Sequence, residues 1–452
     1  MNRVLKRTVM DHTPAFVPPE RAERSALGRL VHGSAVKRDA AASLALVNPA
    51  WLCVIAALAL SLLGVGMIDL ASGGFAVSAG TDAGLSAVAW KQVVFLLIGL
   101  ISATLVALPH YKLLSWVSLP AFVGCVGLLV FLLLPFVPSS IVTPRNGARA
   151  WIDLGPLDLQ PSELTKIAFV LVIAHYMRYR SSHRELRGLL VPGLIAAVPV
   201  GLITLQPDLG TSALFVPSLF AMLVAAGAKL RHLTLIVVAA ALAAPAVYPV
   251  LKPHQKTRIV ALVRQYQGDT ASAQDINFQS YTAQNLIGAG GASGLPAEKS
   301  RALVTFNRLP ERHNDTIFAV VVNRYGFLGG VGLLALTGLW VGGALAASAV
   351  CRTPQGRLIC VGFAAFVATQ MVVNVGMNIG LLPIIGITLP FVSYGGSSLL
   401  TVWLMTGLVM NVALHRETGP YRRSFEYADN DESTKGSAYG VSAGFSGRAV
   451  TR

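Results

Sequence analysis

Residues 51–71, WLCVIAALALSLLGVGMIDLA, decide the class of fold, because they form an apolar run with a single charged side chain, Asp69. A helix that crosses the hydrocarbon core of a bilayer needs about 20 mainly apolar residues. Comparable runs recur near residues 92–109, 113–136, 162–177, 188–205, 209–227, 232–250, 316–349, 358–382 and 396–414. The sequence therefore predicts an all-α polytopic membrane protein with about ten transmembrane helices. The run 316–349 is too long for one straight crossing, so we expect it to bend at Gly326 or at Gly329–Gly330.

The composition excludes an ordinary soluble domain. Apolar residues make up 54% of the chain, charged residues 13%, and the mean hydropathy is +0.62. Soluble domains usually have about 25% charged residues. The net charge of +15 lies mainly in the tails and in short loops between apolar runs, which is the positive-inside pattern of membrane proteins. We therefore expect this charge to meet membrane lipids and no nucleic acid.

The positions of Lys and Arg also predict an orientation. If the N-terminus is cytoplasmic and the runs alternate, most Lys and Arg residues fall on the cytoplasmic side. Both tails, 1–49 and 417–452, are then cytoplasmic, and their polar composition predicts disorder. The transmembrane domain is expected at 50–416, with residues 251–315 forming a large extracytoplasmic loop between the seventh and eighth helices.

Polar residues gather on the predicted outer side in four places, where they are costly in a membrane and tend to mark function. The first place is NGARAWI (146–152) followed by QPSELTK (160–166). Glu163 and Lys166 are spaced i,i+3 and could form an ion pair near the start of a helix that Pro161 opens. The alternative is a capped helix start with one ion pair, with Arg149 and Trp151 as interface anchors.

The second cluster lies between two predicted spans, and the third consists of the predicted extracytoplasmic loop and its end. Gln206 and Asp208 lie in QPDLGT (206–211), where helix capping explains them at least as well as a ligand does. The loop contains His254, Lys256, Arg258 and a glycine run at 288–291, and ends in PERHND (310–315). The glycine run could bind an anion or simply turn the chain. Asn314 or Asp315 could be an N-cap, but one cap does not explain the dense charge of this motif.

The fourth cluster is the proline- and glycine-rich stretch 382–398, which contains Ser393 and Tyr394. Such a broken backbone at membrane depth is tolerated when it is buried in protein or lines a wet cavity. Asn374 and Asn378, spaced i,i+4, would share one helix face toward that cavity. Together the four clusters indicate one outward-facing polar groove with charges of both signs.

These stretches, in this order, resemble the SEDS family, the RodA/FtsW/SpoVE proteins of bacterial cell-wall synthesis. The matching motifs are NGARAWIDLG, QPSELTK, QPDLGT, PERHNDTIFA and LLPIIGITLPFVSYGGSS, and the resemblance covers about residues 45–416. It implies the SEDS fold, a bacterial inner-membrane location, and a glycosyltransferase that polymerises lipid II with a class B penicillin-binding protein. PERHND and the ending GLVMNVALHR (407–416) are more similar to the RodA, or elongation, branch than to the division branch.

The resemblance also implies roles for particular residues. The family's essential acid falls on Asp315, a candidate base for the acceptor hydroxyl. The lipid-linked pyrophosphate that leaves could be stabilised by basic side chains such as Arg312, and a divalent cation, Mg²⁺ or Mn²⁺, could assist. The candidate substrate-binding residues are Glu163, Lys166, Arg149, Trp151, Gln206, Asp208, Lys256, Arg258, Glu311, Arg312, His313, Asn378, Ser393 and Tyr394.

The chain departs from the family pattern in a few places. Asn314 and Thr316 stand where Thr and Phe are usual, Asn323-Arg324 replaces an acidic pair, and a Gly-Lys-Gly is missing after Gly291. The change at 323–324 favours one alternative, a non-catalytic scaffold for a penicillin-binding protein. A second alternative is a lipid II flippase, which predicts ionisable groups near the midplane and on both faces. The polar clusters all lie on the outer side, which favours the enzyme.

Overall fold

The structure is a computed structural model that describes residues 48–72, 84–110, 112–138, 141–142, 148–155, 158–180, 182–247, 249, 253–267 and 277–415. Its elements belong to the compact unit Pro49–Arg452. The disorder predicted for the two tails falls outside the described residues, apart from residues 48 and 49.

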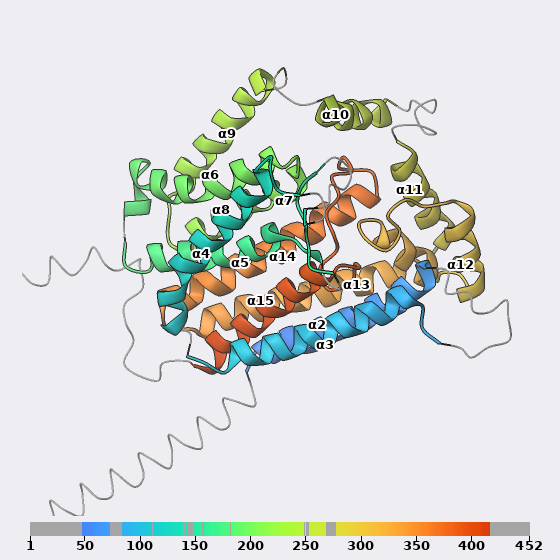
Figure 1. Ribbon diagram of the computed structural model, residues 1–452, viewed down its shortest axis with the longest axis horizontal. Coiled ribbons are helices and arrows are strands. Elements are labelled where there is room, and N and C mark those ends of the chain that lie inside the picture. Colours follow the sequence, from blue (N-terminus) through green and yellow to red (C-terminus); the bar gives the residue numbers. More distant parts are fainter. Residues whose placement is uncertain are drawn as a thin grey trace, which may run out of the picture. The chain divides into compact units, whose positions relative to one another are not determined.

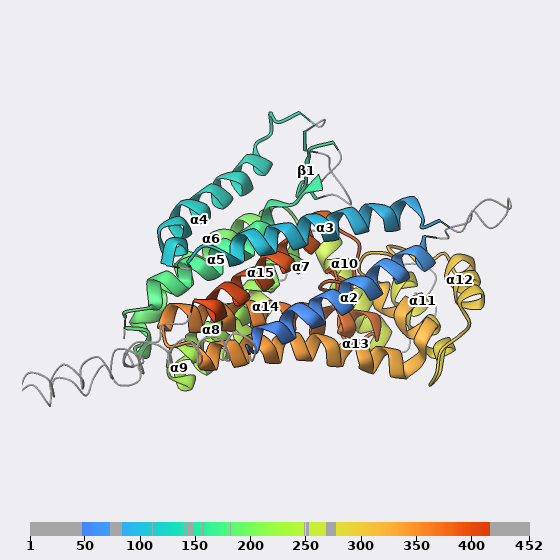
Figure 2. The ribbon, with the colours of Figure 1, turned by 90° about the horizontal axis from the view of Figure 1, so that it is seen from below.

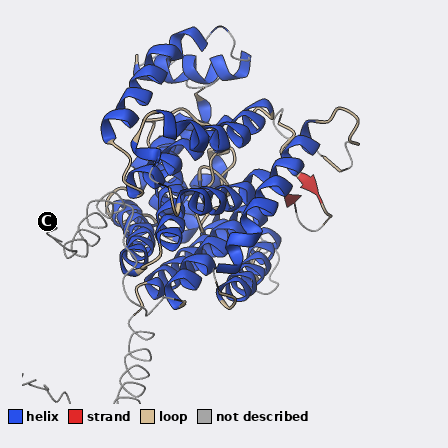
Figure 3. Ribbon diagram, turned by 90° about the vertical axis from the view of Figure 1, so that its left-hand side faces the viewer, coloured by secondary structure: helices blue, strands red, loops and turns tan. Residues whose placement is uncertain are grey.

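Helices make up almost all of the described fold (Figure 3). They are α2 (Ala50–Ala71), α3 (Ala87–Ala107), α4 (Lys112–Leu133), α5 (Pro161–Met177), α6 (Leu190–Leu205), α7 (Leu209–Ala213), α8 (Phe215–Ala225), α9 (Leu230–Val247), α10 (Pro253–Tyr266), α11 (Phe278–Gly290), α12 (Ala297–Phe306), α13 (Ile317–Val350), α14 (Pro354–Asn378) and α15 (Gly396–Leu414). Two 3-10 turns, Ser182–Arg184 and Arg187–Leu189, precede α6. The strands β1 (Ile152–Asp153) and β2 (Asp158–Leu159) form a small antiparallel hairpin.

The predicted membrane spans coincide with helices. Seven segments among the described residues are long and apolar enough to cross a membrane, namely α2, α3, residues 116–133 of α4, residues 187–205 ending in α6, α13, α14 and α15. The other three runs correspond to the 17-residue α5, to α7 with α8, and to α9. The fold is therefore an all-helical multi-pass membrane protein, as the hydropathy predicted.

Several helix boundaries differ from the predicted runs by a few residues, and two differences have a local explanation. Helix α3 begins at Ala87 and not at 92, because the Ser86 side chain caps it by accepting a hydrogen bond from Ala89 N at 3.2 Å. The run 209–227 is interrupted at Leu214. Pro217 lacks the N–H that would donate to the carbonyl of Ala213, which removes one helical hydrogen bond at this point.

Helix α14 lies at the centre of the bundle (Figures 1 and 2). It packs against α5, α8 and α13, while α13 packs against α2 and α15 against α3. The rings of Phe169, Phe215 and Phe366, from α5, α8 and α14, meet edge to face with centroids 5.2–6.2 Å apart, an arrangement that aromatic quadrupoles favour. This aromatic cluster joins α5 and α14, which contribute to the polar site, to α8.

The outer helices expose apolar side chains. Only 28% of the apolar window of α3, and of the windows ending in α4 and α6, is buried inside the protein. Trp90, Leu105 and Leu194 are each at least 60% exposed. Apolar surface of this extent is unusual for a soluble monomer, and it fits contact with lipid tails.

The bend predicted in α13 lies at Gly326, whose φ of 71° and ψ of −168° are not helical. The backbone of the loop after α11 approaches here so closely that a Cβ on Gly326 would lie 2.3 Å from the carbonyl oxygen of Ala292. Phe327 N also donates to Gly291 O at 2.8 Å. Glycine is needed both for the left-handed φ and for the space. The bend separates the first turns of α13, which follow Asp315, from its longer remainder.

Candidate functional site

Asp315 lies in a turned segment, residues 310–316, between α12 and α13. Glu311 adopts a φ of 49°, in the left-handed region. The Thr316 hydroxyl holds this turn, because it donates to the carbonyls of residues 310 and 311 at 2.9 and 3.0 Å. Thr316 occupies the N-cap position of α13, so the interpretation of Asn314 or Asp315 as the N-cap is wrong. Helix capping therefore does not explain why Asp315, a carboxyl residue, is only 7% exposed.

Three successive carbonyls of this segment accept hydrogen bonds from the last third of the chain. Tyr394 N donates to His313 O at 2.7 Å, and the Ser393 hydroxyl donates to Asn314 O. The Asp315 carbonyl accepts from the Nδ2 atoms of both Asn374 and Asn378, each at 2.9 Å. The two asparagines do share one face of α14, and that face meets Asp315. We call these four donors the carbonyl clamp.

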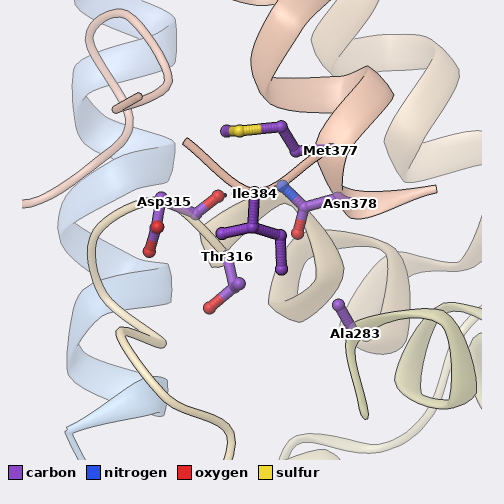
Figure 4. Close-up of a pocket in the computed structure, with 6 residues that line it drawn as sticks. All are labelled: Ala283, Asp315, Thr316, Met377, Asn378 and Ile384. Carbon is purple, nitrogen blue, oxygen red and sulfur yellow. Dashed lines mark hydrogen bonds between the residues drawn. The ribbon is translucent and has the colours of Figure 1, made fainter. Parts of the chain in front are cut away.

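The Asp315 carboxylate lies at a narrow pocket lined by Ala283, Asp315, Thr316, Met377, Asn378 and Ile384. Figure 4 shows these side chains coming from α11, from the segment before α13, from the end of α14 and from the stretch after it. Gln279 of α11 donates from Nε2 to Asp315 Oδ2 at 3.4 Å. A buried carboxylate at a pocket, with its backbone fixed, suits a general base.

Glu163 and Lys166 form the predicted ion pair. Lys166 Nζ lies 2.8 Å from Glu163 Oε1, and their side chains are 1% and 6% exposed. Lys166 Nζ also lies 3.5 Å from Gln370 Oε1, and Gln370 Nε2 donates to Thr388 O at 2.9 Å. Charges buried this deeply are costly unless they are paired. Glu163 and Lys166 compensate each other within α5, and Lys166 also contacts Gln370 of α14.

Helix α14 connects this ion pair to Asp315. Gln370, Asn374 and Asn378 follow one another at intervals of four, so they lie on one face of the helix. All three are at most 2% exposed. The first contacts Lys166 and the other two contact the Asp315 carbonyl. This polar row brings the first and fourth sequence clusters together with the PERHND motif.

Several other predicted residues make contacts within the protein. Gln206 Nε2 donates to Leu129 O at 2.8 Å, and Arg149 Nη2 donates to Val137 O at 3.0 Å. Asp208 caps α7 by accepting from Thr211 N at 3.0 Å, which confirms the capping interpretation. Asp208 Oδ2 also accepts from Gln160 Nε2 at 3.2 Å. This contact joins the QPS and QPD motifs.

The basic residues of the site differ in placement. Lys256 lies on α10, where Nζ donates to Pro249 O at 2.9 Å, and the side chain of Arg258, on the same helix, is outside the described part of the structure. Arg312 and His313 are half-buried beside an exposed Glu311. Burial, and then the positive charge of Arg312, lower the pKa of His313, so this imidazole is neutral at pH 7. Trp151 is half-buried, and residues 146–147 lie outside the described ranges.

The departures at 323–324 have structural roles. Asn323 is fully buried, donates from Nδ2 to Leu286 O at 2.8 Å, and accepts from the Ser300 hydroxyl at 2.6 Å. Arg324 Nη1 donates to Leu295 O at 2.9 Å. These contacts bind α11, α12 and the loop between them to α13. The glycine run at 288–291 belongs to the same contact, because a Cβ on Gly290 would lie 2.3 Å from Val322 O.

Sequence reasoning missed Gln92, Gln279 and Gln370. Gln92 and Gln370 lie inside predicted spans, and Gln279 lies in the predicted loop. A usable signal existed only for Gln370, which is spaced four residues before Asn374 in an otherwise apolar helix. The contacts of Gln92 and Gln279 join residues far apart in the chain, and no local pattern specifies them.

Known proteins place the chain in a family. Residues 50–418 match the model FTSW_RODA_SPOVE, described as "Cell cycle protein". A probable peptidoglycan glycosyltransferase FtsW of Nitrosococcus halophilus is 31% identical over 363 residues, covering 79% of this chain and 90% of that protein.

Two solved structures are similar as well. A chain from work on structural coordination of polymerisation and crosslinking by a peptidoglycan synthase complex matches with a TM-score of 0.66 and 32% identity, covering 82% of this chain and 98% of that one. The rod shape determining protein RodA of Thermus thermophilus matches with a TM-score of 0.57 and 28% identity over the same shares. The fold, the ordered motifs and these matches together establish that this chain belongs to the FtsW/RodA/SpoVE, or SEDS, family.

Proposed function

We propose that this protein is a peptidoglycan glycosyltransferase that polymerises lipid II into glycan strands. The observation that carries the proposal is the buried Asp315 carboxylate, which lies at a pocket and on a backbone segment fixed by the carbonyl clamp. The name of the similar FtsW protein, a probable peptidoglycan glycosyltransferase, supports the same reaction.

The proposed reaction uses Asp315 as a general base. Its carboxylate takes the proton from an acceptor sugar hydroxyl as that oxygen attacks the anomeric carbon of the donor sugar. The new glycosidic bond forms while the bond to the lipid pyrophosphate breaks, and the pyrophosphate leaves as an anion. The neutral His313 adds no charge beside the base, so Arg312 is the nearest cation along the chain.

The leaving anion needs positive charge. Arg312, Lys256 and Arg258 are the residues we propose for it, because guanidinium and ammonium groups stabilise phosphate oxygens. Lys166 is bound to Glu163 and Gln370 in the described structure. Its contacts favour a supporting role in which it keeps α5 and the polar row of α14 in register.

A divalent cation remains a proposal. Among the described residues, no three His, Cys, Asp or Glu side chains come together to hold a metal ion, so the described part of the chain does not form a cation cage of its own. Mg²⁺ is often bound through one or two carboxylates and substrate phosphates, and Asp315 is the carboxylate placed for such a contact. Polymerisation measured with a chelator, and again after Mg²⁺ or Mn²⁺ is added back, tests this.

We also propose the orientation and the partner. The basic loops support cytoplasmic tails, and hence an extracytoplasmic Asp315 and loop 251–315. A class B penicillin-binding protein is the proposed partner, since one similar structure comes from a peptidoglycan synthase complex. Labelling of a cysteine introduced at the exposed Glu311 by a membrane-impermeant reagent in intact cells tests the orientation.

The elongation branch is our proposal within the family. PERHND and GLVMNVALHR support it, and the similar proteins include both a RodA and an FtsW. Expression in cells depleted of either resident protein tests it. Restored rod shape in the first case, with no restored division in the second, is the expected outcome, and the reverse outcome would assign the chain to division.

The scaffold alternative loses its main support, because Asn323 and Arg324 have packing roles away from the pocket-lining residues. Purified protein with its partner, given lipid II in detergent, should produce glycan. The same protein in vesicles should not move lipid II between leaflets. Transport without polymer would favour the flippase, and neither activity from a folded complex would favour the scaffold.

A further inference from the structure

The carbonyl clamp fixes more of the backbone than the packing of one turn requires. It engages three successive peptide groups, at His313, Asn314 and Asp315. Because each residue has only two soft backbone dihedrals, fixing these three carbonyls fixes the dihedrals of the residues between them. The direction in which the Asp315 side chain leaves the backbone is then set by Ser393, Tyr394 and the two asparagines.

Ser393 is itself held by a residue from the other half of the chain. Gln92 of α3 is fully buried, donates from Nε2 to Ser393 O at 3.1 Å, and accepts from Gly395 N at 3.4 Å. The Ser393 hydroxyl additionally accepts from Leu389 N at 2.7 Å. Gln92 therefore links α3 to the turn that binds the Asn314 carbonyl.

The turn around Ser393 is anchored on further sides. Phe391 has a φ of 65°, and its ring contacts the rings of Trp340 and Trp403, with centroids 5.8 and 6.1 Å away. A Cβ on Gly64 of α2 would lie 2.6 Å from Val392 O, so α2 approaches the same turn directly. Strained backbone of this kind persists only where the surroundings hold it, and it clusters at functional sites.

We propose that Gln92, Ser393 and Asn374 are positioning residues for the Asp315 carboxylate. They act through the backbone of residues 313–315 and hold the base at the place where the acceptor hydroxyl binds. This inference rests on the proposed function of Asp315. A displacement of about 1 Å can lower a rate roughly a hundredfold, so loss of one clamp contact changes turnover far more than it changes substrate affinity.

The test compares Ser393→Ala with Ser218→Ala. Ser218 is a fully buried serine of α8 whose hydroxyl donates to Gly362 O at 3.1 Å, so its loss also removes one buried hydroxyl-to-carbonyl hydrogen bond. Gly362 lies twelve residues before Asn374 on α14, about 18 Å along the helix at 1.5 Å per residue. The kcat and the KM for lipid II are measured for both variants with the penicillin-binding partner, together with their thermal unfolding temperatures.

We expect Ser393→Ala to lose roughly ten- to hundredfold in kcat, with KM within about threefold and an unfolding temperature like that of Ser218→Ala. A kcat equal to that of the control, or a raised KM at unchanged kcat, would overturn the proposal. If Ser393→Ala does not accumulate as folded protein, the kcat and the KM of Gln92→Met are measured instead, with the same expected results.

Asp315→Asn serves as the reference variant. If it remains active, the proposed base is wrong and the positioning role falls with it. If Asp315→Asn is inactive and Ser393→Ala is fully active, the positioning role alone is refuted.

Discussion

Buried asparagine side chains donate hydrogen bonds to backbone carbonyls at both ends of the helix bundle, but these bonds have different structural consequences at the two ends. At the end formed by the start of α14 and the end of α15, Asn411 donates from Nδ2 to the carbonyls of Val106 and Pro109, and this contact joins α15 to the end of α3. At the other end, Asn374 makes a similar pair of bonds, but one of its acceptors is the Asp315 carbonyl. Buried side-chain amides thus close helix contacts at one end and converge on a single segment at the other.

The two ends differ in how many donors bind one short backbone segment. The Asn411 contacts join two helices, while four donors from two elements bind successive carbonyls beside a buried carboxylate. A hydrogen bond that only closes a contact contributes to stability. Several bonds on one short segment also fix its geometry, and a catalytic side chain requires that. Convergence is therefore a better guide to the site than the presence of buried polar residues.

The largest effect is expected where a buried charge loses its partner. Lys166→Ala should destabilise the protein by about 3–5 kcal/mol, because Glu163 would remain buried and uncompensated. The double variant Glu163→Gln with Lys166→Met should recover most of that loss. Thermal unfolding in detergent measures both, and equal stability of the single and double variants would show that the pair is not the source of the effect.

The asparagine pair tests the comparison directly. Asn374→Ala and Asn411→Ala should each lose about 1–3 kcal/mol. The first removes the donor to Ile387 O and one of the two donors to Asp315 O, and the second removes the donor to Val106 O and Pro109 O. Only Asn374→Ala should also lose turnover beyond what the amount of folded protein explains. Specific activity per folded molecule, measured for both variants, checks this, and equal activities would make the two ends equivalent.

A glycine pair within α13 tests the bend. Gly326→Ala should cost about 1–3 kcal/mol, because the left-handed φ strains any side chain and the new Cβ would meet Ala292 O. Gly332→Ala is the matched control, since a Cβ there meets nothing within 4 Å and alanine favours a helix. Unfolding temperatures should fall for the first variant and hold or rise for the second. Equal values would show that the bend needs no glycine.

A smaller effect concerns pH. Burial and Arg312 lower the pKa of His313 in the folded protein, so the unfolded chain binds a proton at this residue more readily. Stability should therefore decrease as the pH falls below about 6.5, the ordinary pKa of histidine, until the pH is below the folded value. His313→Gln should reduce the difference in unfolding temperature between pH 7.5 and 5.5, and an unchanged difference would exclude His313 as a source.

Much of this fold could be predicted from local patterns. Apolar runs of membrane length predicted the helices, the i,i+3 spacing predicted the Glu163–Lys166 pair, and Gly326 was one of two bends expected in α13. These features depend on residues close together in the sequence. The start of α3 at Ala87 and the break at Leu214 were missed because a single cap and a single proline decide them.

The candidate site was predictable in its members more than in its geometry. Asp315 stood out through a dense motif, Asn378 through its i,i+4 spacing from Asn374, and Ser393 and Tyr394 through a broken backbone. The hydrogen bonds that join these residues follow from tertiary packing. Gln92 illustrates the limit. It begins one predicted apolar run, and only the approach of residues 393–395, some 300 positions later in the chain, gives it partners.

The most direct measurement is the rate of lipid II polymerisation at saturating substrate by the protein with its class B partner. Wild type is compared with Asp315→Asn, and Glu298→Gln, at an exposed position of α12, is the control. Asp315→Asn keeps the shape of the side chain and removes the base, so we expect a loss of about 10²- to 10⁴-fold in a normally folded protein, and wild-type activity from the control. Activity of Asp315→Asn within a few fold of wild type would contradict the assignment of Asp315 as the base.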